Sequence, residues 1–374
     1  MKTKLSFSQT QRYQMCPRSY KYHYIERIRP NVQSGALAFG TAMDVAINDL
    51  LTTNTNPEAL FEETFTRQKV NEEMTYVPTA ENLVYANSDF DADLLTEDDY
   101  NFIAQQAEAG VVARSSDYLE TFSILRDKKK QRGLEALSKL ELKLHNLMNW
   151  LCLRRKGFYM IAAYRKKVLP KIERVLAVQE YVCLENAAGD KVIGYVDLIA
   201  DIKGIGPVIL DNKTSSMEYA EDAVLTSPQL ALYKHCLEEK FNTKKAGFIV
   251  MKKALMKNKK KVCKTCGNDG SGSRHKTCNA EIEGKRCGGE WAETIDPDVY
   301  IQILIDDIPS MTEEIVMENI DSINEAIKAK QFHRNLHSCT NWYGGNCPYL
   351  KMCYKGDDTG LTCAAPRGES EELK

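Results

Sequence analysis

Two short stretches of the sequence place carboxylates where they can do chemistry. They are Gly194-Tyr195-Val196-Asp197 and Ile209-Leu210-Asp211-Asn212-Lys213. Each reads as an apolar strand that ends in a carboxylate, and the second stretch adds a lysine. Because side chains alternate along a strand, Asp211 and Lys213 share one face while Asn212 points away. If the two strands pair as a hairpin, Asp197 lies beside Asp211, and the group suits a hard divalent cation and a phosphate ester.

The composition is that of a globular protein. The chain has 374 residues, of which 43% are hydrophobic and 27% charged, with a formal net charge of −2. This balance excludes a uniformly basic nucleic-acid coat protein, but it allows a local basic groove. The N-terminus lacks the apolar core of a secretory signal, and no apolar run approaches the ~20 residues of a membrane span. We therefore expect a soluble, cytoplasmic protein without a membrane partner.

The order of predicted elements is that of an α/β protein. Apolar periodicity predicts helices after Ser6 and over residues 36–52, 56–74, 97–165, 227–241 and 298–330. Short apolar runs with turn signals predict strands over residues 176–184, 191–202, 207–212 and 246–251. Residues 75–93 are polar and predict a loop. The pattern indicates a small central sheet with helices, embedded in a largely helical chain.

The spacing of the polar residues resembles the PD-(D/E)XK nuclease superfamily. Asp197 lies fourteen positions before Asp211-Asn212-Lys213, and Gln229-Leu230-Ala231-Leu232-Tyr233 follows. A Gln-x-x-x-Tyr motif on the helix after the catalytic strand is typical of the RecB-like branch, which includes phage exonucleases and CRISPR adaptation nucleases. The resemblance implies a restriction-endonuclease-like core with a small mixed central sheet flanked by helices. It also implies a host-cytoplasmic location if the protein is encoded by a phage.

The resemblance implies roles for the matching residues. Asp197, Asp211 and the carbonyl of Asn212 would hold Mg²⁺ or Mn²⁺, and Lys213 would position or activate water and stabilise charge on the phosphate. Gln229 and Tyr233 would contact the DNA backbone or brace the site. Glu180, on the preceding strand, is a candidate for a further carboxylate.

One position departs from the RecB-like pattern. In Gly40-Thr41-Ala42-Met43-Asp44 an aspartate stands where that branch usually carries histidine. A carboxylate ligates Mg²⁺ at least as naturally as an imidazole does, so activity with an altered metal preference is one reading. The other reading is that Asp44 is a solvated helix residue.

Twelve cysteines are many for a reducing compartment, where clustered thiols indicate metal ligands. Many RecB-like nucleases join their two ends through a 4Fe–4S cluster, and the resemblance implies Cys16, Cys339, Cys347 and Cys353 as its ligands. The seven residues between Cys339 and Cys347 depart from the usual short spacing. Three alternatives remain open: Cys363 replaces Cys339, the site holds zinc, or the thiols are unligated. Cys152, Cys183 and Cys236 are expected to be small buried apolar residues.

A second set of cysteines is local and predicts a zinc-binding knuckle. Its members are Cys263, Cys266, Cys278 and Cys287, and four thiolates at this spacing suit tetrahedral Zn²⁺. His275 is expected to be a bystander. The knuckle interrupts a predicted hairpin between residues 246–251 and 290–295. Lysines on its approach are candidates for DNA-backbone contacts, with Lys252, Lys253, Lys259, Lys260 and Lys261 foremost and Lys257 and Lys264 beside them.

The sequence therefore favours a metal-dependent DNA exonuclease of replication, recombination or repair, with Mg²⁺ or Mn²⁺, a 4Fe–4S cluster and Zn²⁺ as cofactors. No phosphate-binding P-loop is present, so a separate helicase or a single-strand-binding protein is a possible partner. The main alternative is a catalytically weakened nuclease fold that binds DNA or docks a partner; a sequence-specific endonuclease is a third. The expected regions are a helical region over 1–175, a nuclease core over 176–260 and 289–330, the zinc insertion over 261–288, and a cysteine-rich segment over 331–374.

Overall fold

The protein is described from a computed structural model. It describes residues 3–31, 33–70, 73–76, 83–84, 95–96, 98–99, 101, 103, 139–253, 259–270, 273, 275–282, 284–295, 300–340 and 346–363. Predictions for the remaining residues, including Lys257, Gly344-Gly345 and residues 104–138 of the predicted long helix, lie outside this part of the chain.

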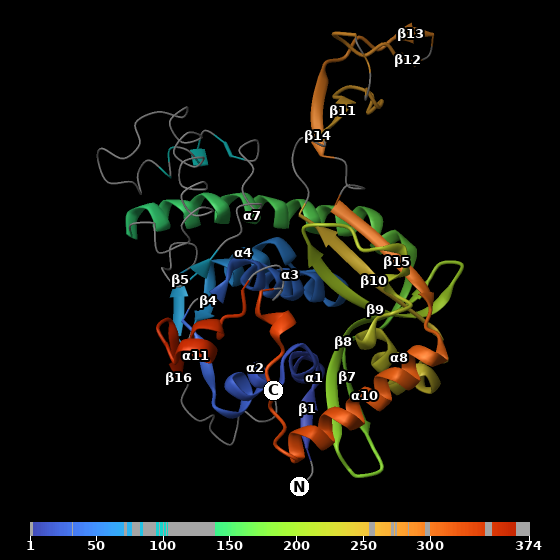
Figure 1. Ribbon diagram of the computed structural model, residues 1–374. Helices are drawn as coiled ribbons and strands as arrows, with labels where there is room; N and C mark the ends of the chain where they lie inside the picture. The colour runs from blue at the N-terminus through green and yellow to red at the C-terminus, as the bar shows by residue number, and fades with distance from the viewer. Residues whose placement is uncertain are drawn as a thin grey trace.

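A mixed six-stranded sheet forms the centre of the molecule (Figure 1). Its strands are β1 (Lys4–Ser6), β7 (Ile172–Glu185), β8 (Lys191–Ile202), β9 (Gly206–Ser215), β10 (Lys245–Lys252) and β15 (Ile301–Asp307). The order is β1-β8-β9-β10-β15, and β7 pairs with the other edge of β8 along nearly its whole length. β9 and β10 are parallel, as are β1 and β8; the other pairs are antiparallel. The predicted α/β core with a small mixed sheet is therefore confirmed.

Helices cover both faces of the sheet and enclose two apolar cores (Figure 1). One face packs against α3 (Gly35–Thr52), α4 (Pro57–Thr66) and α7 (Lys139–Lys167). The other packs against α1 (Phe7–Met15), α8 (Pro228–Phe241) and α10 (Ser310–Lys328). Local signals fix several of these helix ends. Ser6 and Gln9 form a capping box at α1, and the Ser227 hydroxyl accepts the Leu230 N–H at 3.2 Å, with Pro228 at the first turn of α8.

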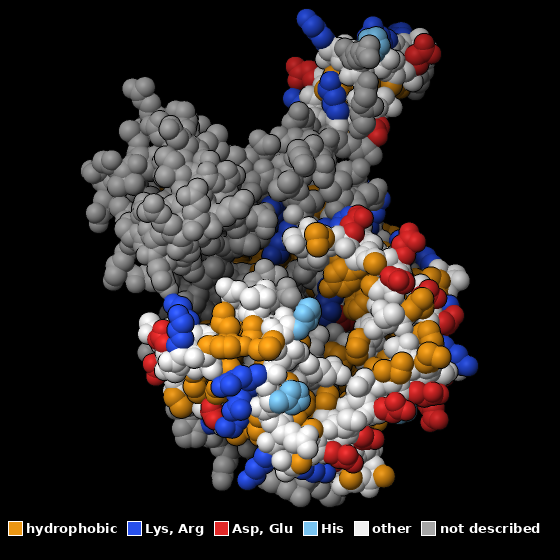
Figure 2. Space-filling model, viewed as in Figure 1, with side chains coloured by type: hydrophobic (Ala, Val, Ile, Leu, Met, Phe, Trp, Pro, Cys, Tyr) orange, Lys and Arg blue, Asp and Glu red, His pale blue; other side chains and the backbone are white. Residues whose placement is uncertain are grey.

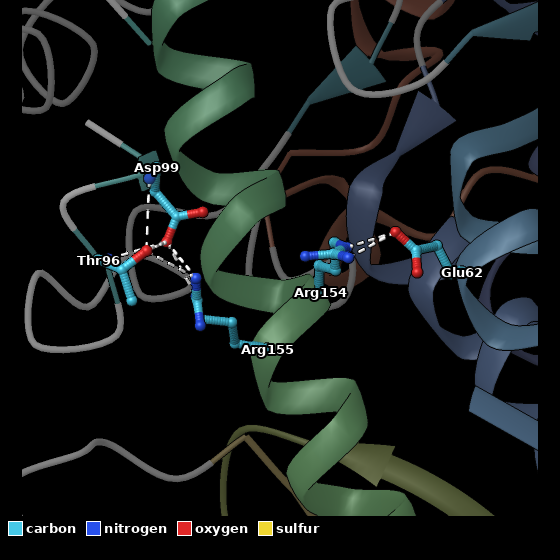
Figure 3. Close-up of polar contacts among 5 residues, drawn as sticks. All are labelled: Glu62, Thr96, Asp99, Arg154 and Arg155. Carbon is cyan, nitrogen blue, oxygen red and sulfur yellow. Dashed lines mark hydrogen bonds and ion pairs between the residues drawn. The ribbon is translucent and has the colours of Figure 1, made fainter. Parts of the chain in front are cut away.

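The long helix α7 is tied to the segments on either side of it (Figure 3). The Arg154 Nε donates to Glu62 of α4 at 2.9 Å, and the Arg155 Nε donates to Asp99 at 3.0 Å. Asp99 is 8% exposed and also accepts the backbone N–H of Thr96 at 2.8 Å. These contacts hold α7 across α3 and α4, and its Tyr164 reaches the central sheet.

The two ends of the described chain meet beside α1. The short helix α2 (Pro17–Tyr20) and the π-helix Lys21–Ile25 lead to β2 (Ile28–Pro30), which pairs with β16 (Leu361–Cys363) near the C-terminus. Asn335, which caps a 3₁₀ turn (Leu336–Cys339), donates its side-chain amide to the Met15 carbonyl at 2.8 Å. α11 (Leu350–Lys355) completes this region. Segments more than 300 residues apart in sequence are thus joined by backbone and side-chain hydrogen bonds.

The cysteine-rich insertion projects from the body of the protein (Figure 1). It consists of the ribbon β11 (Lys259–Cys263) with β14 (Trp291–Ile295) and the small hairpin β12 (Glu281–Ile282) with β13 (Lys285–Arg286). The remaining short strands are β3 (Gln33–Ser34) with β6 (Leu83–Val84), and β4 (Arg67–Val70) with β5 (Glu73–Tyr76).

Four element predictions are wrong, wholly or in part. The helix predicted over 56–74 ends at Thr66, after which β4 and β5 form a hairpin, so part of the loop predicted over 75–93 is strand as well. The helix predicted over 298–330 begins only at Ser310, because residues 301–307 form the edge strand β15. β10 pairs with β15 and not with residues 290–295; of these, Trp291–Ile295 pair with β11 inside the insertion.

Candidate active site

The candidate site lies where β8 stops pairing with β1 and starts pairing with β9. The pairing of β8 with β1 ends at Ile193, and its pairing with β9 begins at Leu198. Residues 194–197 lie between these two ladders, at the point where β8 and β9 diverge. Both sequence stretches with candidate carboxylates therefore end at one fork in the sheet, as their predicted pairing requires.

A hydrogen-bonded chain of side chains fills the fork. The Lys213 Nζ lies 2.6 Å from the Asp211 Oδ2 and donates to the Gln229 Oε1 at 3.0 Å. The Gln229 Nε2 donates to the Asp211 Oδ1 at 3.0 Å and to the Tyr233 Oη at 2.7 Å. The Tyr233 hydroxyl donates to the Tyr195 carbonyl at 2.8 Å, which is a backbone group between the two ladders. The Gln-x-x-x-Tyr pair thus braces Asp211 and Lys213 from one turn of α8.

Asp197 is held by the backbone of the opposing strand. Its Oδ2 accepts the Asn212 N–H at 2.8 Å, and its Oδ1 accepts the Gln179 side-chain amide at 3.3 Å. The Asn212 side chain points to the other face, as predicted, where its Oδ1 accepts the Tyr164 hydroxyl at 3.3 Å.

Glu180 lies outside this group. Its carboxylate pairs with Lys240 of α8, and it does not line the cavity around Asp197 and Asp211. Gln179, its neighbour, reaches Asp197 instead because successive residues of a strand face opposite sides. Gln179 has φ of +53°, an uncommon backbone conformation for a non-glycine residue within a strand. The prediction of Glu180 as a further metal-site carboxylate does not agree with this placement, and no sequence signal singled out Gln179.

The carboxylates face a shared cavity of about 390 Å³. Its lining includes Asp44 from α3, Asp197, Asp211, Lys213 and Gln229. Burial, followed by the charges of Asp211 and Asp44, raises the pKa of Asp197 to about 7. Burial and then the charge of Asp211 also raise the pKa of Asp44, so Asp44 belongs to the same electrostatic group rather than to a solvated helix face.

This arrangement fits a divalent cation. Burial raises the pKa of Asp211 as well, so three carboxyl groups whose ionised forms repel one another converge on one cavity. A hard cation removes that repulsion, and carboxylate and carbonyl oxygens are its preferred ligands. Burial alone would lower the pKa of Lys213, but the charges of Asp211 and Asp197 raise it. The lysine therefore stays an ammonium at neutral pH and cannot act as a free base there.

The sequence family agrees with this geometry. The model of the PD-(D/E)XK nuclease superfamily matches residues 4–354, which is nearly the whole chain. The chain belongs to that superfamily. Among curated proteins, none matches the chain closely enough to count as a relative. In the described part of the nuclease, no helix is long and apolar enough to span a membrane.

The nuclease brings four of its cysteines together beside the joined chain ends. Cys16, Cys339, Cys347 and Cys353 line one small cavity with Tyr349 and Arg334. Cys16 lies at the start of α2, and the Cys347 N–H donates to the Cys339 carbonyl at 2.8 Å. Cys363, on β16, instead directs its thiol to the Glu26 carbonyl at the end of the π-helix. The structure thus brings together the four cysteines that the resemblance implies. Cys339 is among them, although seven residues separate it from Cys347.

The four cysteines of the insertion approach one another more closely. The ligand atoms of Cys263, Cys266, Cys278 and Cys287 all lie within 4.8 Å of one another, so the group could hold one metal ion. Burial acts to raise the pKa of the Cys263 thiol, but hydrogen bonds from the Cys266 and Thr265 backbone N–H groups lower it to about 6. A thiolate is the form that binds metal. His275 is not part of this group; its carbonyl accepts the Trp291 indole N–H at 2.9 Å.

The predicted basic approach is only partly described. Lys252 pairs with Glu218, Lys253 lies 5.3 Å from the Phe39 ring centre, and Lys261 lies 5.6 Å from the Trp291 ring centre. The side chains of Lys259 and Lys260 are outside the described set. The insertion carries both basic and acidic side chains on the face that Figure 2 shows.

The remaining cysteines divide. Cys152 is fully buried, as predicted, and Cys236 is half-buried. Cys183 is exposed, so the prediction that it is buried is wrong; it lies on the solvent side of the β7–β8 ribbon.

Proposed function

We propose that this member of the PD-(D/E)XK superfamily is a Mg²⁺- or Mn²⁺-dependent DNA exonuclease of replication, recombination or repair. The observation that carries the proposal is the single hydrogen-bonded group of Asp211, Lys213 and Gln229 beside Asp197. An exonuclease is favoured over a sequence-specific endonuclease by the Gln-x-x-x-Tyr pair and by the cysteines at both chain ends, which resemble end-processing nucleases.

In this proposal Asp44, Asp197, Asp211 and the Asn212 carbonyl hold the cation, which lowers the pKa of water and offsets charge on the phosphate. The Lys213 ammonium faces the phosphate oxygens and orients the attacking water. Gln229 keeps that ammonium aimed by accepting one of its protons at 3.0 Å while donating to Asp211. Tyr233 fixes Gln229 against the backbone of β8.

Two further cofactors are part of the proposal. Cys16, Cys339, Cys347 and Cys353 hold a 4Fe–4S cluster that links the chain ends. Their shared cavity supports this assignment, because it brings the thiol of Cys16 together with three thiols from the C-terminal segment. The insertion holds Zn²⁺, whose binding supplies folding energy that its short strands lack.

The test is digestion of end-labelled linear DNA by protein purified without oxygen, with Mg²⁺ or Mn²⁺. Lys213→Ala is expected to lose cleavage by roughly 100-fold or more, because electrostatic stabilisation of this kind is a large part of catalysis. Lys203→Ala is the matched control, since Lys203 is an exposed lysine in the turn between the same two strands. Closed circular DNA should resist digestion.

The competing function is a nuclease fold that only binds DNA or docks a partner. Folded, metal-loaded wild-type protein that leaves linear single- and double-stranded DNA intact would favour it over the enzyme. Equal cleavage by wild type and Lys213→Ala would remove the role given to the lysine.

A further inference from the structure

Two exposed tyrosines lie side by side on the ribbon that carries Asp197. Tyr181 of β7 and Tyr195 of β8 are register partners, and their rings meet edge to face with centres 5.5 Å apart. They are 47% and 45% exposed, respectively, so both rings are open to solvent. Neither ring contributes to the catalytic cavity lining described above.

The two rings lie on the solvent side of the ribbon. The opposite side packs on α8: Val182 is 2% exposed, and a Cβ placed on its register partner Gly194 would lie 3.1 Å from the Tyr233 ring. Because side chains alternate, Tyr181 and Tyr195 face away from α8.

Gln179 and Asp197, which are joined by a hydrogen bond, lie two residues along the same two strands from Tyr181 and Tyr195. Two residues of a strand span roughly 7 Å. Along the ribbon, the aromatic pair therefore stands about one nucleotide's reach from the proposed reaction centre.

We propose that the Tyr181–Tyr195 pair is a stacking platform for the unpaired bases of a single-stranded DNA end, next to the phosphate to be cleaved. The proposal rests on the proposed nuclease function and names its substrate form. Exposed aromatic rings on a rigid scaffold bind single strands without regard to sequence, because every base has a π-face.

The nearest acidic side chains on the two sides of β7 are both neutralised. Glu185 shares the side of Tyr181 by alternation and pairs with Lys191 at 3.1 Å, whereas Glu180 faces α8 and pairs with Lys240. A nucleic-acid strand passing over the rings therefore does not meet an unpaired carboxylate from either residue.

The experiment measures binding and stacking separately from cleavage. A single-stranded oligonucleotide with 2-aminopurine near its end is titrated with protein in EDTA, following anisotropy and base fluorescence; a blunt duplex of the same sequence is titrated in parallel. The double variant Tyr181→Leu/Tyr195→Leu is compared with Tyr181→Phe/Tyr195→Phe, which keeps both rings. Melting temperatures of all variants show whether the ribbon is intact.

The leucine pair is expected to weaken single-strand binding roughly tenfold or more and to abolish the fluorescence change, since base–aromatic stacking carries that much affinity. The phenylalanine pair should retain both signals, and the duplex should bind all three proteins alike. Unchanged single-strand affinity in the leucine variant overturns the proposal. If the leucine pair melts early, the single Tyr181→Leu variant gives the same comparison. If the wild-type protein never cleaves DNA but binds single strands through the two rings, the proposed nuclease function is refuted and the stacking platform is supported.

Discussion

The raised pKa of Asp197 makes metal binding depend on pH near neutrality. Its pKa of about 7 arises from burial and from the charges of Asp211 and Asp44. A cation must displace the proton before Asp197 can ligate it. From pH 8 to pH 6 the ionised fraction of this carboxyl falls from about nine tenths to about one tenth, so the dissociation constant for Mn²⁺ should rise about tenfold.

The same shift acts on the stability of the metal-free protein. Because the pKa of Asp197 is higher in the folded than in the unfolded chain, stability is greatest below the unfolded value near 4 and falls as the pH rises towards 7. The full shift corresponds to about 4 kcal/mol. Bound metal should restore the melting temperature above pH 7 by mass action.

Calorimetric titration of metal-free protein with Mn²⁺ at pH 6 and pH 8, in two buffers of different ionisation enthalpy, measures both the affinity and the protons released. Asp44→Asn removes one of the repelling charges, so it should lower the pKa of Asp197 and move the proton release to lower pH. Asp197→Asn should abolish most of the proton release on Mn²⁺ binding. Equal Mn²⁺ affinity at the two pH values, with no proton release at pH 6, would refute this electrostatic account of the site.

Four further substitutions test the packing around the site and the metal of the insertion. Asp99→Ala should destabilise the protein by about 2 kcal/mol, since it removes a buried partner of α7, whereas Glu62→Ala, at a more exposed pair, should cost less than about 1 kcal/mol in denaturant unfolding. Gly157→Ala should cost about 1–3 kcal/mol, because its Cβ would fall 2.1 Å from the Phe61 ring; an unchanged melting temperature would contradict that packing. Cys287→Ser should release the insertion's metal, measured by a chromogenic chelator, without lowering the main melting transition.

Local spacing in the sequence brings together more of the candidate site residues than of the elements around them. Strand alternation alone predicts that Asp211 and Lys213 share one face, and in the structure the Lys213 Nζ lies 2.6 Å from the Asp211 Oδ2. Gln229 was placed by helix spacing, which is equally local. The sequence could not show that Gln179, and not Glu180, reaches Asp197. A shift of one residue along a strand reverses the face of the side chain, and Gln179 adopts a positive φ.

The missed strand β15 has a different physical cause. Its partner β10 lies about fifty residues earlier, and the cysteine-rich insertion separates them. An apolar run such as Ile301–Asp307 is ambiguous between helix and strand until its partner is known. Residues 291–295, which follow β10 sooner along the chain, pair with β11 inside the insertion and are therefore not the partner of β10.

The meeting of the two chain ends sets the order in which this protein can be completed during synthesis. β1 pairs with residues 191–193, β2 pairs with residues 361–363, and the Met15 carbonyl bonds to Asn335. Residues 4–30 thus find their partners in segments made much later, near residues 191, 335 and 361. Such long-range contacts form slowly, because the loop-closure entropy is lost before they contribute. The N-terminal helices must therefore wait, and a chain truncated before residue 335 would leave their inner faces uncovered.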